Sequence, residues 1–263
     1  MSRMLTLIHA GWAAARATAT SGRRADALAQ VARLLTLPDL PAGVAADAHR
    51  LAAELEIETE SYKAARRHLR AATALEPAHA RTHYLAGVAL ERDPAGDDRR
   101  AARRFRRAST LVPGSALYRA AFGRAAVRCG MVKTGLTELR TAADAGLTYT
   151  AILRIVIDGL VEAGRVANAR RVLVQARFAR PHDPTVKAMW ERVRFEAART
   201  GQRTARRTQE ARPATEGAFR SLPFVRLVGG SPRPAATGER VRRDVISLPR
   251  PHLARLGFTK ADC

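Results

Sequence analysis

The chain has 263 residues and carries 46 lysine and arginine side chains against 24 aspartates and glutamates, a formal net charge of +22. A charge this high favours acidic partners and repels other basic proteins, although an arginine-biased coding genome is an alternative origin for much of it. Two cysteines exclude a disulfide framework, and no apolar run approaches the roughly 20 residues of a membrane-spanning helix, so we expect a cytoplasmic protein.

The first 183 residues repeat a small–large–small pattern of side chains, clearest in Ala65, Leu69 and Ala72 and followed by Pro77. Positions i, i+4 and i+7 share one helix face, where the small residues admit a neighbouring helix and the large one fills the gap. Proline then ends the helix because it lacks an N–H and clashes with the preceding turn. The first small residues of the five copies, which we call anchors, are Ala27, Ala65, Ala101, Gly135 and Ala169. Their steps of 38, 36, 34 and 34 residues predict an array of helix pairs.

A second marker precedes each copy. It is a pair of residues about twelve positions before the anchor, and in four of the five copies the second residue of the pair is small. The fifth pair, Val156 and Ile157, departs from this rule, so we expect either that this pair is spaced differently or that the register is wrong there. Gly22, Gly130 and Gly164 each stand five residues before an anchor. A tight turn between two helices needs a positive φ there, which glycine adopts without steric cost.

These features resemble the tetratricopeptide repeat family, most strongly at residues 80–115 and 150–183, with His83 in place of the family's usual tryptophan. The resemblance covers roughly residues 8–183 and implies an all-α, right-handed superhelical solenoid of about five helix hairpins. Residues 184–200 then form a closing helix. A generic alanine-rich helical bundle is the alternative fold.

The periodicity stops at Gly201, which divides the chain into a solenoid (1–200) and a basic tail rich in proline and arginine (201–263). Such a composition buries too little apolar surface to offset the entropy of ordering, so we expect the tail to be disordered. Within it, residues 219–228 and 245–258 contain spaced apolar side chains. They are either short recognition motifs or parts of a solvated linker.

The sequence offers no catalytic constellation. His79 and His83 are four residues apart, but no third ligand stands near them at zinc-site spacing, and in the repeat register His83 replaces a packing aromatic residue. We therefore predict a non-catalytic protein with no cofactor and no metal.

A concave groove is the first candidate binding site. In the family that the sequence resembles, first-helix side chains line this groove, and the register places Asp47, Arg50, Glu54 and Glu58 at its acidic N-terminal end. Arginine forks bind carboxylates with two hydrogen bonds, and Tyr84 and Val88 are candidate apolar anchors. We expect an adaptor that binds an acidic peptide or helix of a protein partner, the alternative being that these arginines are simply solvated. The predicted groove residues are Arg81, Tyr84, Val88, Arg92, Arg124, Val127, Arg128, Arg154, Asp158 and Arg192.

A dense arginine run on the opposite, convex face is the second candidate site, supported by Arg66, Arg67 and Arg70 in the preceding repeat. These guanidinium groups and the basic tail could bind phosphates of a nucleic acid in a salt-dependent way. Aromatic residues make up only 5% of the chain, so base stacking is not expected and binding would be non-specific. The alternative is a solvated surface. The predicted phosphate-binding residues are Arg99, Arg100, Arg103, Arg104, Arg106 and Arg107.

Overall fold

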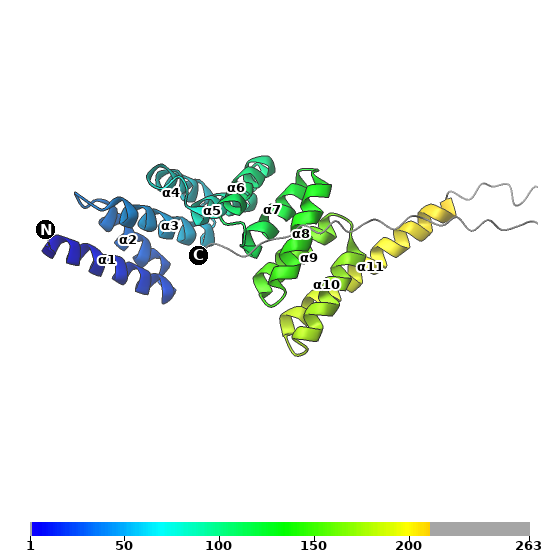
Figure 1. Ribbon diagram of the computed structural model, residues 1–263. Coiled ribbons are helices and arrows are strands. Elements are labelled where there is room, and N and C mark those ends of the chain that lie inside the picture. The colour runs from blue at the N-terminus through cyan, green and yellow to red at the C-terminus, as the bar shows by residue number, and fades with distance from the viewer. Residues whose placement is uncertain (1, 211–263) are drawn as a thin grey trace, which may run out of the picture. The chain divides into compact units, whose positions relative to one another are not determined.

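The computed structural model describes the backbone of residues 2–210 and the side chains of residues 4–199. Every regular element in this part of the chain is an α-helix, as predicted, and Figure 1 shows the helices following one another in chain order. None of the helices described is both long and apolar enough to cross a membrane. The helices are α1 (Ser2–Thr20), α2 (Arg24–Leu35), α3 (Ala42–Glu58), α4 (Tyr62–Leu75), α5 (Ala80–Arg92), α6 (Asp98–Leu111), α7 (Ala116–Arg128), α8 (Val132–Gly146), α9 (Thr150–Glu162), α10 (Val166–Ala179) and α11 (Pro184–Glu210).

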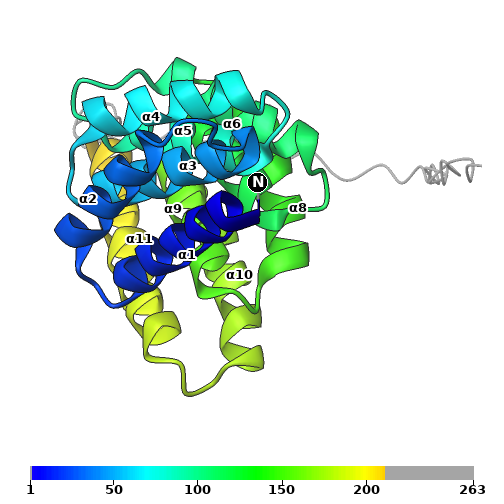
Figure 2. The same ribbon diagram turned by 90° about the vertical axis from the view of Figure 1, so that its left-hand side faces the viewer.

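The first ten helices form five hairpins, in which an odd-numbered helix packs against the even-numbered helix that follows it. Each even-numbered helix also contacts the next odd-numbered helix, so every hairpin packs on its neighbour, and α11 covers the last one. Figures 1 and 2 show this stacking, with α4 and α6 on the same side of α5. The prediction of a solenoid of helix hairpins with a closing helix is confirmed.

The predicted small–large–small positions form the interior of the hairpins. Phe105 is fully buried, and a Cβ placed on Gly87 would lie only 2.6 Å from its ring, so the two helices meet where one residue has no side chain. Burying each large side chain contributes about 2–3 kcal/mol. The large residues at this position are Val31, Leu69, Phe105, Leu139 and Leu173, and each is at most 2% exposed.

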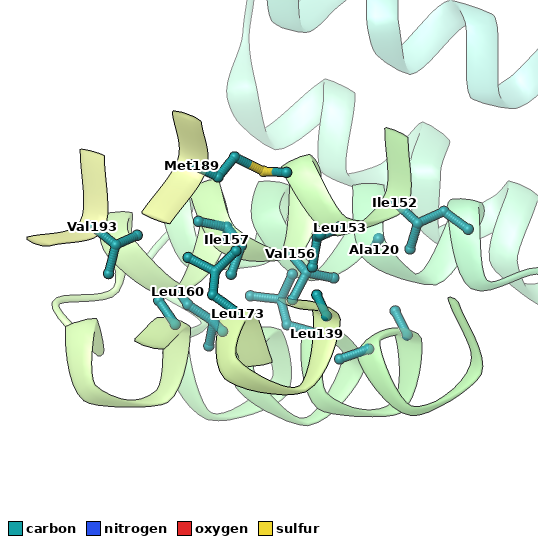
Figure 3. Packing of buried hydrophobic residues seen from close by; sticks show 14 of the residues in the cluster. Ala120, Leu139, Ile152, Leu153, Val156, Ile157, Leu160, Leu173, Met189 and Val193 are labelled. Atoms are coloured by element: carbon teal, nitrogen blue, oxygen red, sulfur yellow. The ribbon is translucent and has the colours of Figure 1, made fainter. Parts of the chain in front are cut away.

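The fifth hairpin shows why its marker pair departed from the rule. Val156 and Ile157 are both fully buried in the cluster that joins α7 to α11, as Figure 3 shows. Gly159 of α9 makes a close approach of another kind, because a Cβ added there would lie 2.8 Å from Cδ1 of Leu139 on α8. This small residue faces the preceding hairpin and not α10, so it is not a shifted copy of the marker.

The turns between paired helices have the predicted backbone conformation. Gly22, Gly130 and Gly164 have φ values of +80°, +81° and +69°. Glu60 occupies the equivalent position in the second hairpin and has a φ of +61°, a left-handed conformation that disfavours residues with a Cβ. Four hairpins thus share one turn geometry, and only the second lacks glycine in it.

The last helix is longer than the sequence indicated. α11 begins at Pro184 as expected but runs to Glu210, so the expected boundary at residue 200 falls inside a helix. The remainder of the predicted disordered tail, residues 211–263, and both of its apolar stretches lie outside the residues that the structure describes.

Candidate functional site

Ion pairs connect successive odd-numbered helices on the face that was predicted to form the groove. Arg81 of α5 lies 2.7 Å from Glu54 of α3, and Arg124 of α7 lies 2.6 Å from the Glu91 carboxylate of α5. Further along, Arg128 of α7 lies 2.8 Å from Glu162 of α9. Asp158 of α9 accepts a hydrogen bond from Arg192 of α11 and also faces Arg124 at 3.6 Å. We call this set the ion-pair ladder: Glu54, Arg81, Glu91, Arg124, Arg128, Asp158, Glu162 and Arg192.

The ladder changes the electrostatic character expected of the groove. The sequence suggested free arginines, but Arg124 and Arg128 share the carboxylate of Glu91, whose side chain is only 9% exposed. Hydrogen bonding to Glu162 further raises the pKa of Arg128, so its charge is permanent. Glu91 was missed because the register selected its neighbour, Arg92. A signal was available, since each ladder partner lies about one repeat away in sequence.

Two of the predicted groove cations remain without a carboxylate partner. Arg92 at the end of α5 and Arg154 on α9 are exposed, and no described carboxylate lies within ion-pair distance of either. Arg92 and Arg124 are close enough to the Tyr84 hydroxyl to oppose the effect of burial, which raises the pKa of Tyr84. Tyr84, Arg92 and the centre of the ladder therefore form one neighbourhood.

The predicted apolar groove residues take part in packing. Val127 is only 7% exposed and belongs to the core, so its assignment to the groove surface is corrected. Its Cγ2 occupies the space that a side chain at Gly135 would need, 2.7 Å from the Cβ position of that glycine. Tyr84 and Val88 are half-buried, with the Tyr84 ring 5.3 Å from that of Tyr118. Tyr84 keeps a partly accessible surface, whereas Val127 is almost completely covered.

Arg50 is also misplaced by the register. It is 5% exposed, and its Nη1 donates to Glu76 at 2.7 Å and to the Thr82 hydroxyl at 3.3 Å, while Nη2 donates to Asp47. The side chain thus joins α3, the end of α4 and α5. It is a structural cation of the solenoid interior.

A second surface feature lies between α4, α5 and α6. It is an open hollow of about 690 Å³, which we call the arginine channel. Arg66 and Arg70 of α4 line one side, and α6 lines the other. The lining residues are Arg66, Leu69, Arg70, Thr73, His83, Ala86, Leu90, Ala95, Gly96, Asp97, Arg100, Arg103, Arg104 and Arg107.

The channel contains four of the six arginines predicted to bind phosphate, namely Arg100, Arg103, Arg104 and Arg107. Arg99 and Arg106 are exposed on α6 but do not line the channel. The predicted stripe is therefore divided between two faces of the helix.

Carboxylates compensate only part of the charge in the channel. Arg66 pairs with Asp93, and Arg100 lies 3.3 Å from Asp97. Hydrogen bonds stabilise the charged form of both carboxylates. The one from the Arg66 side chain lowers the pKa of Asp93, and the one from the Arg100 backbone N–H lowers the pKa of Asp97. The other four guanidinium groups, those of Arg70, Arg103, Arg104 and Arg107, have no carboxylate partner among the described residues.

The histidines serve packing roles. His83 is 5% exposed, and its Nε2 lies 2.9 Å from the Pro77 carbonyl oxygen, which confirms that it replaces a packing aromatic. His49 and His68 contact each other through their Nδ1 atoms at 2.8 Å, between α3 and α4. Among the described residues, no three histidine, cysteine, aspartate or glutamate side chains are grouped as a metal site would require.

The stacked hairpins, the shared turn geometry and the interhelix ladder define a helical-repeat protein with the tetratricopeptide-repeat fold, as the resemblance implied. The solved structures to which it is similar include TTC0263, a thermophilic TPR protein of Thermus thermophilus, with a TM-score of 0.57, 16% identity, and coverage of 72% of this chain and 99% of that one. YrrB, a TPR protein with an unusual peptide-binding site, has a TM-score of 0.50 at 18% identity over 66% of this chain and 87% of its own. A chain of the APC/C hetero-tetramer Cut9–Hcn1 has a TM-score of 0.53 at 14% identity, over 68% of this chain and 34% of that chain. No protein-family profile and no curated protein sequence matches the chain.

Proposed function

We propose that this protein is a non-catalytic interaction scaffold that holds an extended segment of a partner protein against its odd-numbered helices. The observation that carries the proposal is the ion-pair ladder, because it joins α3, α5, α7, α9 and α11 edge to edge into one continuous polar surface. Such repeat surfaces bind extended chains rather than small molecules. YrrB, which has a similar fold, is described as having a peptide-binding site, and this supports the same use here.

We further propose that the bound segment is acidic. Arg92 and Arg154 are exposed and unpaired within the described residues, so each can take a carboxylate of the partner with two hydrogen bonds. Arg192 is half-exposed and can donate hydrogen bonds to a carboxylate of the partner in addition to Asp158. The partly accessible surface of Tyr84 supplies an apolar contact near Arg92.

The ladder carboxylates limit the strength of this interaction. A partner carboxylate that approaches Arg124 or Arg128 must displace Glu91, which exchanges one ion pair for another and gains little free energy. The selectivity for acidic segments therefore depends mainly on Arg92 and Arg154. It follows that an acidic segment binds by a few spaced carboxylates and that a long polyacidic run has no added advantage.

The experiment is a peptide-display selection on the full chain, followed by affinity measurement on the selected peptides with the double variant R92E/R154E. Arg124 and Arg128 are unsuitable for this test, because replacing them leaves Glu91 buried beside no counter-ion. The matched control is R106E/R140E, which makes the same charge change at exposed positions on α6 and α8 that belong neither to the ladder nor to the channel lining.

We expect the selected peptides to contain spaced acidic residues and to bind R92E/R154E at least tenfold more weakly, with the control within about twofold of the original protein. Equal affinity for both variants would show that the segment binds elsewhere. Selection of peptides without acidic residues would refute the acidic preference.

A further inference from the structure

The arginine channel is the place among the described residues where positive charge gathers without matching carboxylates. Six arginines and one aspartate line it, while the ladder arginines on the other surface each face a glutamate or aspartate. Crowded guanidinium groups repel one another, which costs folding free energy that Asp93 and Asp97 offset only in part. An anionic ligand removes this repulsion.

The arginines are arranged in two facing rows. Arg66 and Arg70 are four residues apart and share one face of α4. Arg100, Arg103 and Arg107 follow one another along one face of α6, on the other side of the channel, with a rise of about 10 Å from first to last. A ligand lying along the channel therefore meets guanidinium groups from both sides and over a length that exceeds one anionic group.

The lining between the rows is aliphatic. Leu69, Ala86 and Leu90 contribute to it together with the buried His83, and no phenylalanine, tyrosine or tryptophan lines the channel. Bases of a nucleic acid bind to proteins largely by stacking on such rings, so this site lacks the usual means of holding and reading them. The channel is therefore suited to the charged sugar–phosphate backbone of a nucleic acid and not to its bases.

A phosphate group fits two facing rows better than a carboxylate does. A phosphodiester offers oxygens in more than one direction, so guanidinium groups on opposite sides can bind it together, whereas a carboxylate is usually satisfied by one fork. Asp93 and Asp97 hold Arg66 and Arg100 in place, which leaves Arg70, Arg103, Arg104 and Arg107 for the ligand. A single strand is flexible enough to follow this open hollow of about 690 Å³ and to turn its phosphates to either row, so we take it as the ligand in preference to a rigid duplex.

We propose that the arginine channel binds the sugar–phosphate backbone of a single-stranded nucleic acid without base preference. This site is separate from the surface assigned to a protein segment, and the two can be occupied independently. Binding is expected to weaken steeply with salt, since about four phosphate contacts give a slope of log K against log salt near −3 for a single strand.

The test uses the full chain and a fluorescent oligouridylate of about 12 nucleotides, with binding followed by anisotropy over a range of salt concentrations. The channel variant is R103Q/R107Q, and the matched control is R99Q/R106Q, which removes the same charge from the same helix outside the channel. Thermal melts show whether both variants fold, and the basic tail is present in both, so only the position of the lost charge differs.

We expect R103Q/R107Q to bind about tenfold more weakly and to lose about 1.4 from the salt slope, at 0.7 for each of two phosphate contacts. The control should stay within about twofold, and an oligoadenylate should bind as well as the oligouridylate. An equal loss in both variants would show that binding is diffuse electrostatic attraction. Absence of binding to the original chain, or equally strong displacement by a polyglutamate peptide, would overturn the proposal, the latter in favour of an acidic protein ligand.

Discussion

The guanidinium group of Arg124 on α7 lies 2.6 Å from the carboxylate of Glu91 on α5, and both side chains are largely buried. The same arginine also faces Asp158 of α9, so one residue connects three consecutive hairpins. In a repeat protein, stability comes from each unit and from the interfaces between neighbours. This pair therefore contributes to the coupling between hairpins and at the same time sets the charge of the proposed binding surface.

Replacing Glu91 by glutamine should destabilise the protein, because the largely buried Arg124 then keeps only the more distant carboxylate of Asp158, at 3.6 Å. We expect E91Q to lower the free energy of unfolding by about 1–3 kcal/mol, measured by urea denaturation. The control is E58Q, since Glu58 pairs with Arg24 in a contact whose side chains are both 52% exposed, and its loss should cost less than about 0.5 kcal/mol. Equal effects of the two substitutions would contradict a special role for Glu91.

The same substitution should strengthen binding of an acidic segment. In E91Q, Arg124 and Arg128 each lose one of two carboxylate partners and keep only Asp158 and Glu162 respectively, so each has hydrogen-bonding capacity to spare for the partner. Peptides selected on the original chain are therefore expected to bind E91Q severalfold more tightly, measured by anisotropy under conditions in which the variant is folded. A weaker affinity would mean that Glu91 positions the arginines for the ligand rather than competing with it.

Arg50 should be far more important for stability than a surface arginine. R50M removes the cation and its hydrogen bonds to Glu76, Asp47 and Thr82, and because both carboxylates stay partly solvated we expect a loss of about 1–3 kcal/mol in chemical denaturation. R33M on the exposed side of α2 makes the same chemical change and should alter stability by less than about 0.5 kcal/mol. Similar stabilities would show that the Arg50 contacts contribute little net energy.

The left-handed turn at Glu60 offers a stabilising substitution. E60G relieves the steric cost of a Cβ at a φ of +61°, and we expect a gain of about 0.5 kcal/mol after the greater entropy of unfolded glycine is allowed for. G130A makes the opposite change at a φ of +81° and should cost about 1 kcal/mol. Thermal melts of both variants check the pair. A lower melting temperature for E60G would mean that Glu60 makes compensating contacts.

The pair of His49 and His68 should make the protein less stable in mild acid. Burial lowers the pKa of both side chains, and their Nδ1–Nδ1 hydrogen bond needs one nitrogen without a proton. The unfolded chain therefore binds more protons than the folded one as the pH falls through about 6.5, so the stability is full above that value and declines below it.

Replacing His49 by glutamine should flatten this decline, measured as the free energy of unfolding between about pH 7.5 and about pH 5.5. Some dependence should remain, since burial and the nearby Arg50 also lower the pKa of His79. Burial raises the pKa of the neighbouring Glu56, which acts in the opposite direction, because the folded chain then holds that proton at a higher pH than the unfolded chain does. An unchanged slope in H49Q would exclude the histidine pair as its source.

The helices, their pairing and their turns could be predicted because they depend on residues close together in sequence. Leu69 and Phe105 are buried where the pattern of side chains indicated, and Gly130 and Gly164 adopt the positive φ that a short turn between helices needs. Val127 was assigned wrongly because the register describes an average repeat. Its burial depends on the missing side chain of Gly135 across the hairpin, a detail particular to this pair.

The sequence by itself therefore determined a solenoid of five hairpins with a closing helix, since each repeat specifies its own two helices and its own turn. Only the tertiary structure decided which charges are free. The partners in the ladder lie 27 to 37 positions apart on different hairpins, so whether an arginine is neutralised depends on the residue that packing places opposite it. For that reason Arg124 is paired, while Arg103, on a surface where the neighbouring helix also presents arginines, has no described carboxylate partner.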